Sequence, residues 1–262
     1  MLNLVSVGIS SYNFHNHVAS DIGINQLFIA PNNIQSQSYM NRICNWTNQN
    51  QMQLNNKKTK IMIFNFTHNY EFTTRIFIQE SLLDIIDEIK LLGVIVTSDL
   101  KWSQNTNTLV RKSYARMQIL RKLYGFNVPT ADLIKIYIIY VRSLLEISCV
   151  VWASSLTEQQ ITKLERIQKV ALRIILGDSY QCYEHALAIT NLQTLQERRK
   201  DLCIKFAKKC LTNDRTKDIF PLNTVTTDTA TRHREKYFVQ MARTDRLAKS
   251  AVPYMQRLLN NQ

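Results

Sequence analysis

Glycine and proline are scarce in this chain, with five and four copies among 262 residues. Loop-rich proteins and most all-β proteins need more of both residues for their turns, so this composition favours long helices. The hydrophobic content of 45% is enough for a sizeable core. Length and composition together predict one large or two modest domains.

The cysteines indicate neither a disulfide framework nor a zinc finger. Their number, five, is odd, and no two of them form a Cys-x-x-Cys pair. We therefore expect reduced thiols in an intracellular protein, cytoplasmic or nuclear. His15 and His17 could face one way on a strand, but no further metal-binding pair lies near them, so a metal site there is the less favoured interpretation.

An uninterrupted hydrophobic run of membrane-spanning length is also missing. The best candidate, residues 133–152, contains Lys135, Arg142 and Glu146, and each charge near mid-bilayer costs about 2.5–3.5 kcal/mol. The N-terminus shows no basic segment followed by an apolar core, so no secretory signal is evident. We expect a soluble chain without a membrane partner, in which 133–152 is a buried core helix.

Acidic residues are scarce, relative to basic ones, in one part of the chain only. The formal net charge is +13, but residues 1–100 carry 6 Lys and Arg against 7 Asp and Glu, whereas residues 101–262 carry 27 against 13. This asymmetry suggests an acidic partner, either nucleic acid or an anionic membrane surface. The alternative is a helical protein whose lysines and arginines are merely solvated.

The first hundred residues contain short runs of β-branched and aromatic residues, which predict strands. These runs lie at 2–7, 24–29, 60–66, 75–78, 82–86 and 91–96. The first two predict a hairpin with Asp21 near its bend. A helix capped near residue 32 is expected to reach residue 50, with Met40, Ile43 and Trp46 inward.

From residue 103 onward the pattern is helical. Thr130 can cap a helix whose apolar residues on nearly every side predict a central place in a bundle. The inward positions of the helix before it keep a spacing of three to four: Leu109, Ser113, Met117, Leu120 and Tyr124. Two capping boxes, Thr157 with Gln160 and Thr194 with Glu197, predict two further helices. The first of these is expected to end at Gly177 and the second near residue 211.

These patterns together predict an α+β fold in three parts. Residues 1–100 are expected to form a small antiparallel sheet with a helix. Residues 101–222 are expected to form an all-α helical domain, and residues 223–262 a threonine-rich loop followed by a basic segment.

The helix that begins after Thr157 combines an apolar face with a basic one. At 100° per residue, four cations fall within about a third of its circumference. They are Lys163, Arg166, Lys169 and Arg173, and Leu164, Ile167, Ala171 and Ile175 lie on the opposite side. An ordinary amphipathic helix with a solvated face explains this pattern. A stripe that faces phosphates explains it as well, and Glu165 is the only acid between Lys163 and Arg173.

Several spaced motifs resemble the C-terminal part of a LINE-type (non-LTR) retrotransposon reverse transcriptase. The first comprises Trp46, Leu54-Asn55 and Lys58-Thr59-Lys60 ahead of a strand. Further motifs come in order at 90–94, 99–102, 142–152, 164–177, 192–203 and 244–254. The resemblance covers nearly the whole chain from about residue 15. It implies an RNA-directed DNA polymerase in which a palm holds magnesium and a helical thumb holds the template–primer duplex.

The resemblance places the catalytic motif of the palm at Val18-Ala19-Ser20-Asp21, where the family has an aromatic residue, any residue and two aspartates. Here Ser20 stands in place of the first aspartate, and Asp21 alone remains as a magnesium ligand. The family also places a lysine near the nucleotide phosphates at Lys58 and the primer-gripping turn at Leu92 and Gly93. A solvated turn lysine and a plain β-turn explain the same residues.

The resemblance leaves three hypotheses open. In the first, residues 1–100 are a palm remnant, and the chain has no polymerase activity but binds an RNA or RNA/DNA template–primer through its basic thumb. In the second, an upstream segment or a partner, the missing N-terminal half of the polymerase, supplies the carboxylates and the enzyme is active with magnesium. In the third, the chain is a transposon relic without function.

Overall fold

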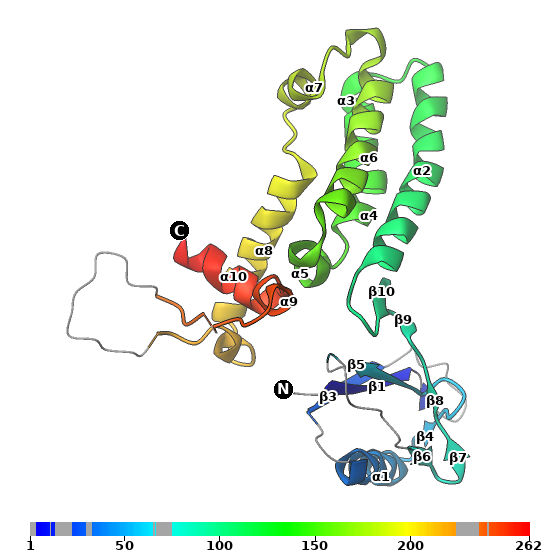
Figure 1. The fold of residues 1–262 in the computed structure, drawn as a ribbon. Helices are drawn as coiled ribbons and strands as arrows, with labels where there is room; N and C mark the ends of the chain where they lie inside the picture. The colour runs from blue at the N-terminus through cyan, green and yellow to red at the C-terminus, as the bar shows by residue number, and fades with distance from the viewer. Residues whose placement is uncertain are drawn as a thin grey trace, which may run out of the picture. The chain divides into compact units, whose positions relative to one another are not determined.

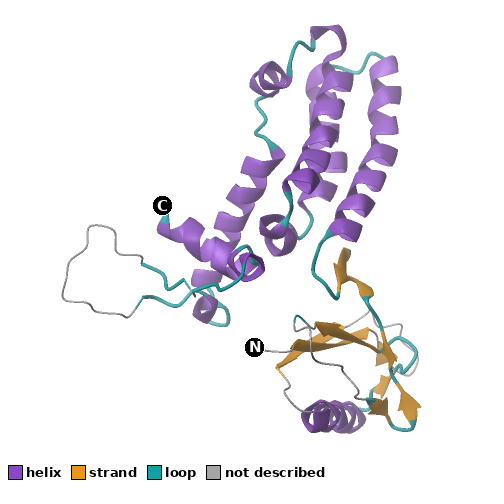
Figure 2. Ribbon diagram, in the orientation of Figure 1, coloured by secondary structure: helices purple, strands orange, loops and turns teal. Residues whose placement is uncertain are grey.

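The structure is a computed structural model that describes residues 4–10, 12–13, 23–29, 33–64, 66, 75–223, 236–239 and 241–262. The fold is mixed α+β, and the chain divides into two compact units, Met1–Leu100 and Lys101–Gln262 (Figure 1). Strands are confined almost entirely to the first unit, while the second is helical (Figure 2).

The first unit contains one long helix, α1 (Asn33–Gln49). Its strands are β1 (Leu4–Ser10), β2 (Tyr12–Asn13), β3 (Gly23–Ile29), β4 (Gln53–Leu54), β5 (Lys60–Phe64), β6 (Phe77–Ile78), β7 (Ser81–Leu82), β8 (Asp84–Ile85), β9 (Glu88–Leu91) and β10 (Val94–Thr97).

The largest sheet of this unit has the strand order β3-β1-β5-β8. Strand β1 is antiparallel to both neighbours, and its pairing with β3 brings Ser10 opposite Gly23, as the predicted hairpin requires. Strand β8 runs parallel to β5, with Lys60 opposite Asp84, so the expectation of a wholly antiparallel sheet was wrong at this edge. Residues 65–83 separate the two strands, and a connection of a dozen or more residues is long enough to return in the same direction.

The core of the first unit lies between α1 and the strands. Its buried residues are Met40, Ile61, Ile76, Ile78 and Leu83, with Ile43 packed against them. Met40 and Ile43 thus lie inward as predicted, but Trp46 is 49% exposed. The inward position of the last helical turn belongs to Thr47, which is 1% exposed, because Thr47 lies 20° from the direction of Met40 whereas Trp46 lies 120° from it.

Residues 91–96, predicted as one strand, form a hairpin instead. Strands β9 and β10 pair with Leu91 opposite Val94, which leaves Leu92 and Gly93 as a two-residue turn. Both residues have positive φ, 46° at Leu92 and 90° at Gly93. Positive φ at both central residues is the geometry of a type I′ turn, whose twist matches that of the flanking strands.

The second unit is built from helices, and the longest connection between them runs from Ile219 to Asp245. They are α2 (Ser103–Gly125), α3 (Thr130–Ile136), the π-helical segment η1 (Tyr137–Arg142), α4 (Ser143–Glu146), α5 (Cys149–Trp152), η2 (Ala153–Ser155), α6 (Glu158–Leu176), η3 (Gly177–Ser179), α7 (Tyr183–Thr190), α8 (Leu195–Leu211), η4 (Lys217–Ile219), α9 (Asp245–Ala248) and α10 (Ala251–Asn260). Helices α2 and α6 lie side by side (Figure 1).

Helix α2 buries the face that its periodicity predicts, except at its last member. Leu109, Ser113, Met117 and Leu120 are at most 3% exposed, whereas Tyr124 is 43% exposed. Tyr124 lies in the last turn of α2, close to Gly177 at the end of α6.

The expectation of one central helix over 130–152 was wrong in two respects. The helix changes to π geometry at η1 and breaks at Ser148, whose φ is 49°. It also buries one face rather than all sides, because Ile139 is 73% and Tyr140 is 40% exposed. Its N-cap is Pro129, and the Thr130 side chain makes no capping bond. Thr130 is therefore the first residue of the helix rather than its cap.

Both predicted capping boxes are present. Thr157 accepts a hydrogen bond from the backbone N of Gln160, whose side chain in turn accepts one from the backbone N of Thr157. Thr194 and Glu197 repeat this exchange at the start of α8. Helix α6 ends at Gly177, whose φ is 51°.

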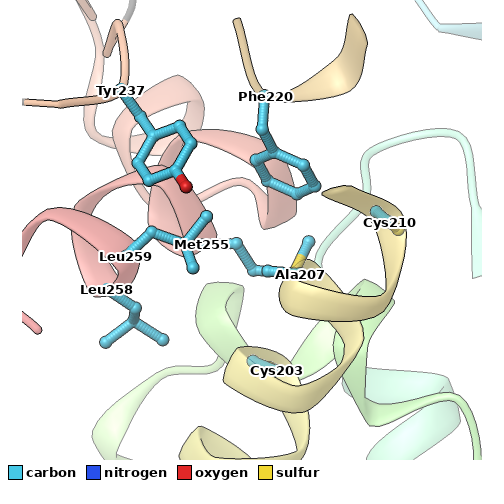
Figure 3. Packing of buried hydrophobic residues seen from close by; sticks show 8 residues of the cluster. All are labelled: Cys203, Ala207, Cys210, Phe220, Tyr237, Met255, Leu258 and Leu259. Atoms are coloured by element: carbon cyan, nitrogen blue, oxygen red, sulfur yellow. The ribbon is translucent and has the colours of Figure 1, made fainter. Parts of the chain in front are cut away.

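The C-terminal helix packs onto α8 and so belongs to the helical unit. The buried cluster that joins them consists of Cys203, Ala207, Cys210, Phe220, Tyr237, Met255, Leu258 and Leu259 (Figure 3). The Asn260 side chain holds the backbone of Tyr237 there through two hydrogen bonds. Its Oδ1 accepts one from the backbone N of Tyr237, and its Nδ2 donates one to the carbonyl O of Tyr237. Of the threonine-rich segment predicted as a loop, residues 224–231 lie outside the described residues.

Within the described residues, no single helix has the length and apolar character to cross a membrane. One bent pair of segments, Thr130–Glu146 and Cys149–Ser155, passes such a test jointly with a bend of 41°.

Candidate nucleic-acid interface

The basic stripe lies on the outer face of α6. Its opposite face is fixed in the core of the helical unit, where Leu164, Ile167 and Ala171 are fully buried and Ile175 is 1% exposed. The four basic side chains of the stripe, Lys163, Arg166, Lys169 and Arg173, are all exposed. None of them forms an ion pair with any of the described residues. Their charge is therefore available to an external partner.

Two tyrosines that the sequence analysis did not single out support the stripe. The Nζ atom of Lys169 lies 4.8 Å from the ring centroid of Tyr183, and the Cζ atom of Arg173 lies 5.1 Å from that of Tyr180. Such cation–π contacts contribute about 0.5–1 kcal/mol at exposed sites. In the sequence, the sign of these contacts is the pair of aromatic residues that follows shortly after Gly177, where α6 ends.

Glu165, the only acid within the stripe, is directed into the fold. Its Oε1 atom accepts hydrogen bonds from the Tyr183 hydroxyl and, at 3.1 Å, from the backbone N of Leu195. Burial, followed by the hydrogen bond to Glu165, raises the pKa of Tyr183 far above its ordinary value, so the phenol stays protonated. The carboxylate thus joins α6 to α7 and α8 and does not neutralise the stripe.

Gln168 extends this buried network beneath α6. Its Oε1 atom accepts a 2.7 Å hydrogen bond from the Tyr137 hydroxyl. Its Nε2 atom donates to the Tyr183 hydroxyl at 2.9 Å and to the carbonyl of Gln193 at 2.8 Å. Both groups of the Gln168 amide thus have partners, and such buried hydrogen bonds help to fix the relative positions of the helices that contribute to them. The basic face of α6 is therefore held by a rigid base.

Helix α2, which packs against α6, adds to the positive charge. It carries Arg111, Lys112, Arg116, Arg121 and Lys122 and no acidic residue. Arg116 is engaged within the unit, since its Nη1 donates to the Tyr140 carbonyl at 2.7 Å and its Cζ lies 4.8 Å from the Tyr140 ring centroid. Clustered cations of this kind raise the local concentration of polyanions and make phosphate contacts.

The remaining candidate residues with described positions lie in the first unit. Lys58 is exposed in a turn in which its backbone N donates to Asn55 Oδ1 at 3.2 Å. Leu92 and Gly93 form the β9–β10 turn, and the Leu92 side chain is 82% exposed. The structure thus places Lys58 and the turn in one unit and the α6 stripe in the other.

The candidate magnesium ligand lies outside the described residues. This holds for Asp21, for Ser20 beside it, and for His15 and His17. Among the residues that are described, no group of three or more His, Cys, Asp or Glu side chains could hold a metal ion. Magnesium at Asp21 stays a prediction.

Two buried cysteines are poorly suited to act as nucleophiles. Burial raises the pKa of Cys149 to about 11 and that of Cys203 to about 12. Reactive cysteines have a lowered pKa, because the thiolate is the nucleophile. All five cysteines are free.

No family model, no curated protein and no solved structure matches this chain. The resemblance to reverse transcriptases therefore rests on the residue motifs alone.

Proposed function

We propose that the helical unit binds the phosphate backbone of an RNA or RNA/DNA template–primer duplex, in the manner of a reverse-transcriptase thumb. The observation that carries this proposal is the α6 stripe, in which four cations are exposed while the one acid among them is bonded inside the fold. Phosphate contacts from Lys and Arg supply most of the sequence-independent affinity for nucleic acid. The acid-free helix α2 beside α6 supports the same function.

The first unit is proposed as a palm remnant without polymerase activity of its own. Phosphoryl transfer by two metal ions needs several carboxylates that converge on one point. Ser20 offers a neutral hydroxyl in place of the first aspartate of the motif, which leaves Asp21 alone. The exposed Leu92–Gly93 turn corresponds to the primer-gripping turn that the resemblance implies.

Duplex binding is tested by titrating salt. The variant with Lys163, Arg166, Lys169 and Arg173 all changed to Gln should bind an RNA/DNA duplex more weakly. The slope of log affinity against log salt should fall by roughly 3–4, about one per lost phosphate contact. Fluorescence anisotropy of a labelled duplex between low and moderate salt measures both quantities.

The matched control removes the same charge elsewhere in the helical unit. Lys205, Lys208, Lys209 and Arg215 are exposed, and their change to Gln should leave the slope nearly unchanged. Equal weakening by both variants would show that net charge binds the duplex, and absence of binding at low salt would refute the proposal.

The alternative of an active polymerase has its own assay. Magnesium-dependent nucleotide incorporation on a primed RNA template is expected to be absent in the natural sequence. Incorporation by the natural chain, alone or with a supplied upstream segment, would favour the enzyme over the binding module. Ser20→Asp restores the first aspartate of the pair and tests whether its loss alone explains the inactivity.

A further inference from the structure

A cavity of about 270 Å³ lies in the helical unit, where the start of α6, the first turns of α8 and the α9–α10 junction meet. Its polar lining comes from Ser154, Glu158, Arg199, Lys200, Lys249 and Tyr254, among others. The volume is slightly below the range of roughly 300–1,000 Å³ that is usual for small-molecule sites. The cavity therefore suits a small polar group rather than a large ligand.

Arg199 is a buried cation with unused hydrogen-bonding capacity. Arg199 is among the residues that line the cavity although it is only 3% exposed, and its Cζ atom lies 5.8 Å from the ring centroid of Trp152. Its Nη1 atom is buried and finds no acceptor among the described residues. The hydroxyl of Ser154, also in the cavity lining, is buried without a partner as well. An unpaired buried polar group in a folded protein calls for an explanation such as a bound ion or water.

The acids inside the fold do not satisfy Arg199. Glu146 pairs with Arg142 and Arg198, each through an Nε–Oε1 distance of 3.2 Å. The Oε1 atom of Glu165 is taken by Tyr183 and Leu195. Burial lowers the pKa of Arg199, while the charge of Glu165 raises it. A guanidinium nevertheless keeps its charge in proteins. Arg199 is therefore a charged hydrogen-bond donor at a buried position.

Two further cations line the same cavity. Lys200 follows Arg199 on α8, and Lys249 ends α9, where its carbonyl accepts a 2.9 Å hydrogen bond from the Ser155 hydroxyl. Neither ammonium forms an ion pair with the described residues. Glu158 is the one acid in the lining, so cations outnumber acids by three to one.

We propose that this cavity binds a phosphate group, with Arg199 and Ser154 as the buried donors and Lys200 and Lys249 as the cations at its edge. A guanidinium fork with nearby ammonium groups matches the charge and the several acceptor oxygens of a phosphate. The source is either a free nucleotide or the terminal phosphate of a nucleic-acid strand. This proposal goes beyond the proposed duplex binding, because none of the four cations of the α6 stripe lines the cavity.

The test uses the full chain and inorganic phosphate as the first probe. Isothermal titration calorimetry should show saturable binding, and phosphate should raise the Tm of the helical unit. Changing both Lys200 and Lys249 to Gln should weaken phosphate binding by roughly tenfold or more, because charge-assisted hydrogen bonds are about twice as strong as neutral ones. Both side chains are exposed, so this variant is expected to fold.

The matched control changes Lys205 and Lys208, exposed on the same helix but outside the cavity lining, to Gln. It should bind phosphate as the natural chain does. Arg199→Gln should abolish binding; if that variant does not fold, the Lys200 and Lys249 variant decides the matter. Absence of saturable binding, or equal weakening in the control, would overturn the proposal.

Two further probes identify the source of the phosphate. They are applied to the variant that lacks the α6 stripe, so that failure of duplex binding and failure of the cavity are distinguishable. Tighter binding of adenosine 5′-monophosphate than of inorganic phosphate would assign a nucleotide. A preference for a 5′-phosphorylated oligonucleotide over its 5′-hydroxyl counterpart would assign a strand end.

Discussion

The two units of this chain differ in charge and in the size of the side chains that they bury completely. The first unit is close to neutral and has a small core around Met40 and Ile61, while Leu82 and Ile85 remain 52% exposed. The second carries nearly all of the positive charge and fully buries residues as large as Trp152 and Tyr137.

The difference shows where stability and binding capacity reside. The sheet of the first unit ends in β3 and β8, and edge strands present backbone groups that seek partners. Two long helices of the second unit, α6 and α8, begin with capping boxes and bury one face each. We infer that the second unit is the more stable scaffold, and three predictions test this contrast.

The largest effect is expected from Trp152→Ala in the helical unit. Trp152 is fully buried, and its Nε1 donates a 3.0 Å hydrogen bond to the Ile147 carbonyl. Replacing a buried Trp by Ala costs about 3–5 kcal/mol. Amide hydrogen exchange read by mass spectrometry should show lost protection in α6 and α8, and Val151→Ala, at a 49% exposed neighbour, should show almost none. Equal loss of protection in the strands of the first unit would contradict two separate cores.

An intermediate effect is expected from Gly177→Ala at the end of α6. Gly177 has φ 51° and ψ −123°, a region essentially restricted to glycine, and such strain costs about 1–3 kcal/mol. An added Cβ would also lie 2.0 Å from the Tyr124 hydroxyl, but Tyr124 is 43% exposed and can turn away. Denaturant unfolding should therefore show a loss that Tyr124→Ala does not restore. Full restoration in the double variant would show that the clash, and not the backbone, dominates.

The smallest effect, and one of opposite sign, is expected from Leu92→Asn in the first unit. Leu92 has a left-handed backbone, which suits leucine poorly, whereas Asn-Gly is the preferred type I′ pair. We expect β9 and β10 to gain up to about 1 kcal/mol of protection in hydrogen exchange. Leu92→Ala should give no gain, because alanine tolerates positive φ no better. A gain with Ala as large as that with Asn would point instead to the exposed apolar side chain.

Features set by neighbouring residues could be read from the sequence. The capping boxes at Thr157 and Thr194 were predicted to the residue, because a cap depends on side chains three positions apart. The hairpin of β1 and β3 and the bounds of α1 were also close to their predictions.

Features set by distant contacts could not be read in this way. An apolar residue such as Trp46 or Ile139 fits a buried face, yet both are exposed, since only the facing elements decide which side is covered. The parallel pairing of β8 with β5 depends on a long connection whose direction no local pattern reports.

In the candidate interface, too, the features set by local sequence were predictable and those set by distant contacts were not. Exposure of the stripe on α6 was predictable from a period of 3.6 residues. The rings of Tyr180 and Tyr183 beneath Arg173 and Lys169, and the burial of Arg199 beside a cavity, arise from α7 and α8 folding back onto α6.

The π-helical segment η1 affects which side of the helix the residues before and after it face. Leu133, Tyr137, Val141 and Leu145 recur at intervals of four and are all buried, although four residues of an α-helix overshoot a full turn by 40°. A π turn is wider and rotates less per residue, so it takes back part of this drift. Deleting one residue from 137–142 would turn α3 relative to α4 by an angle somewhat below the 100° per residue of an α-helix. In this stretch, chain length is a structural parameter as strict as residue identity.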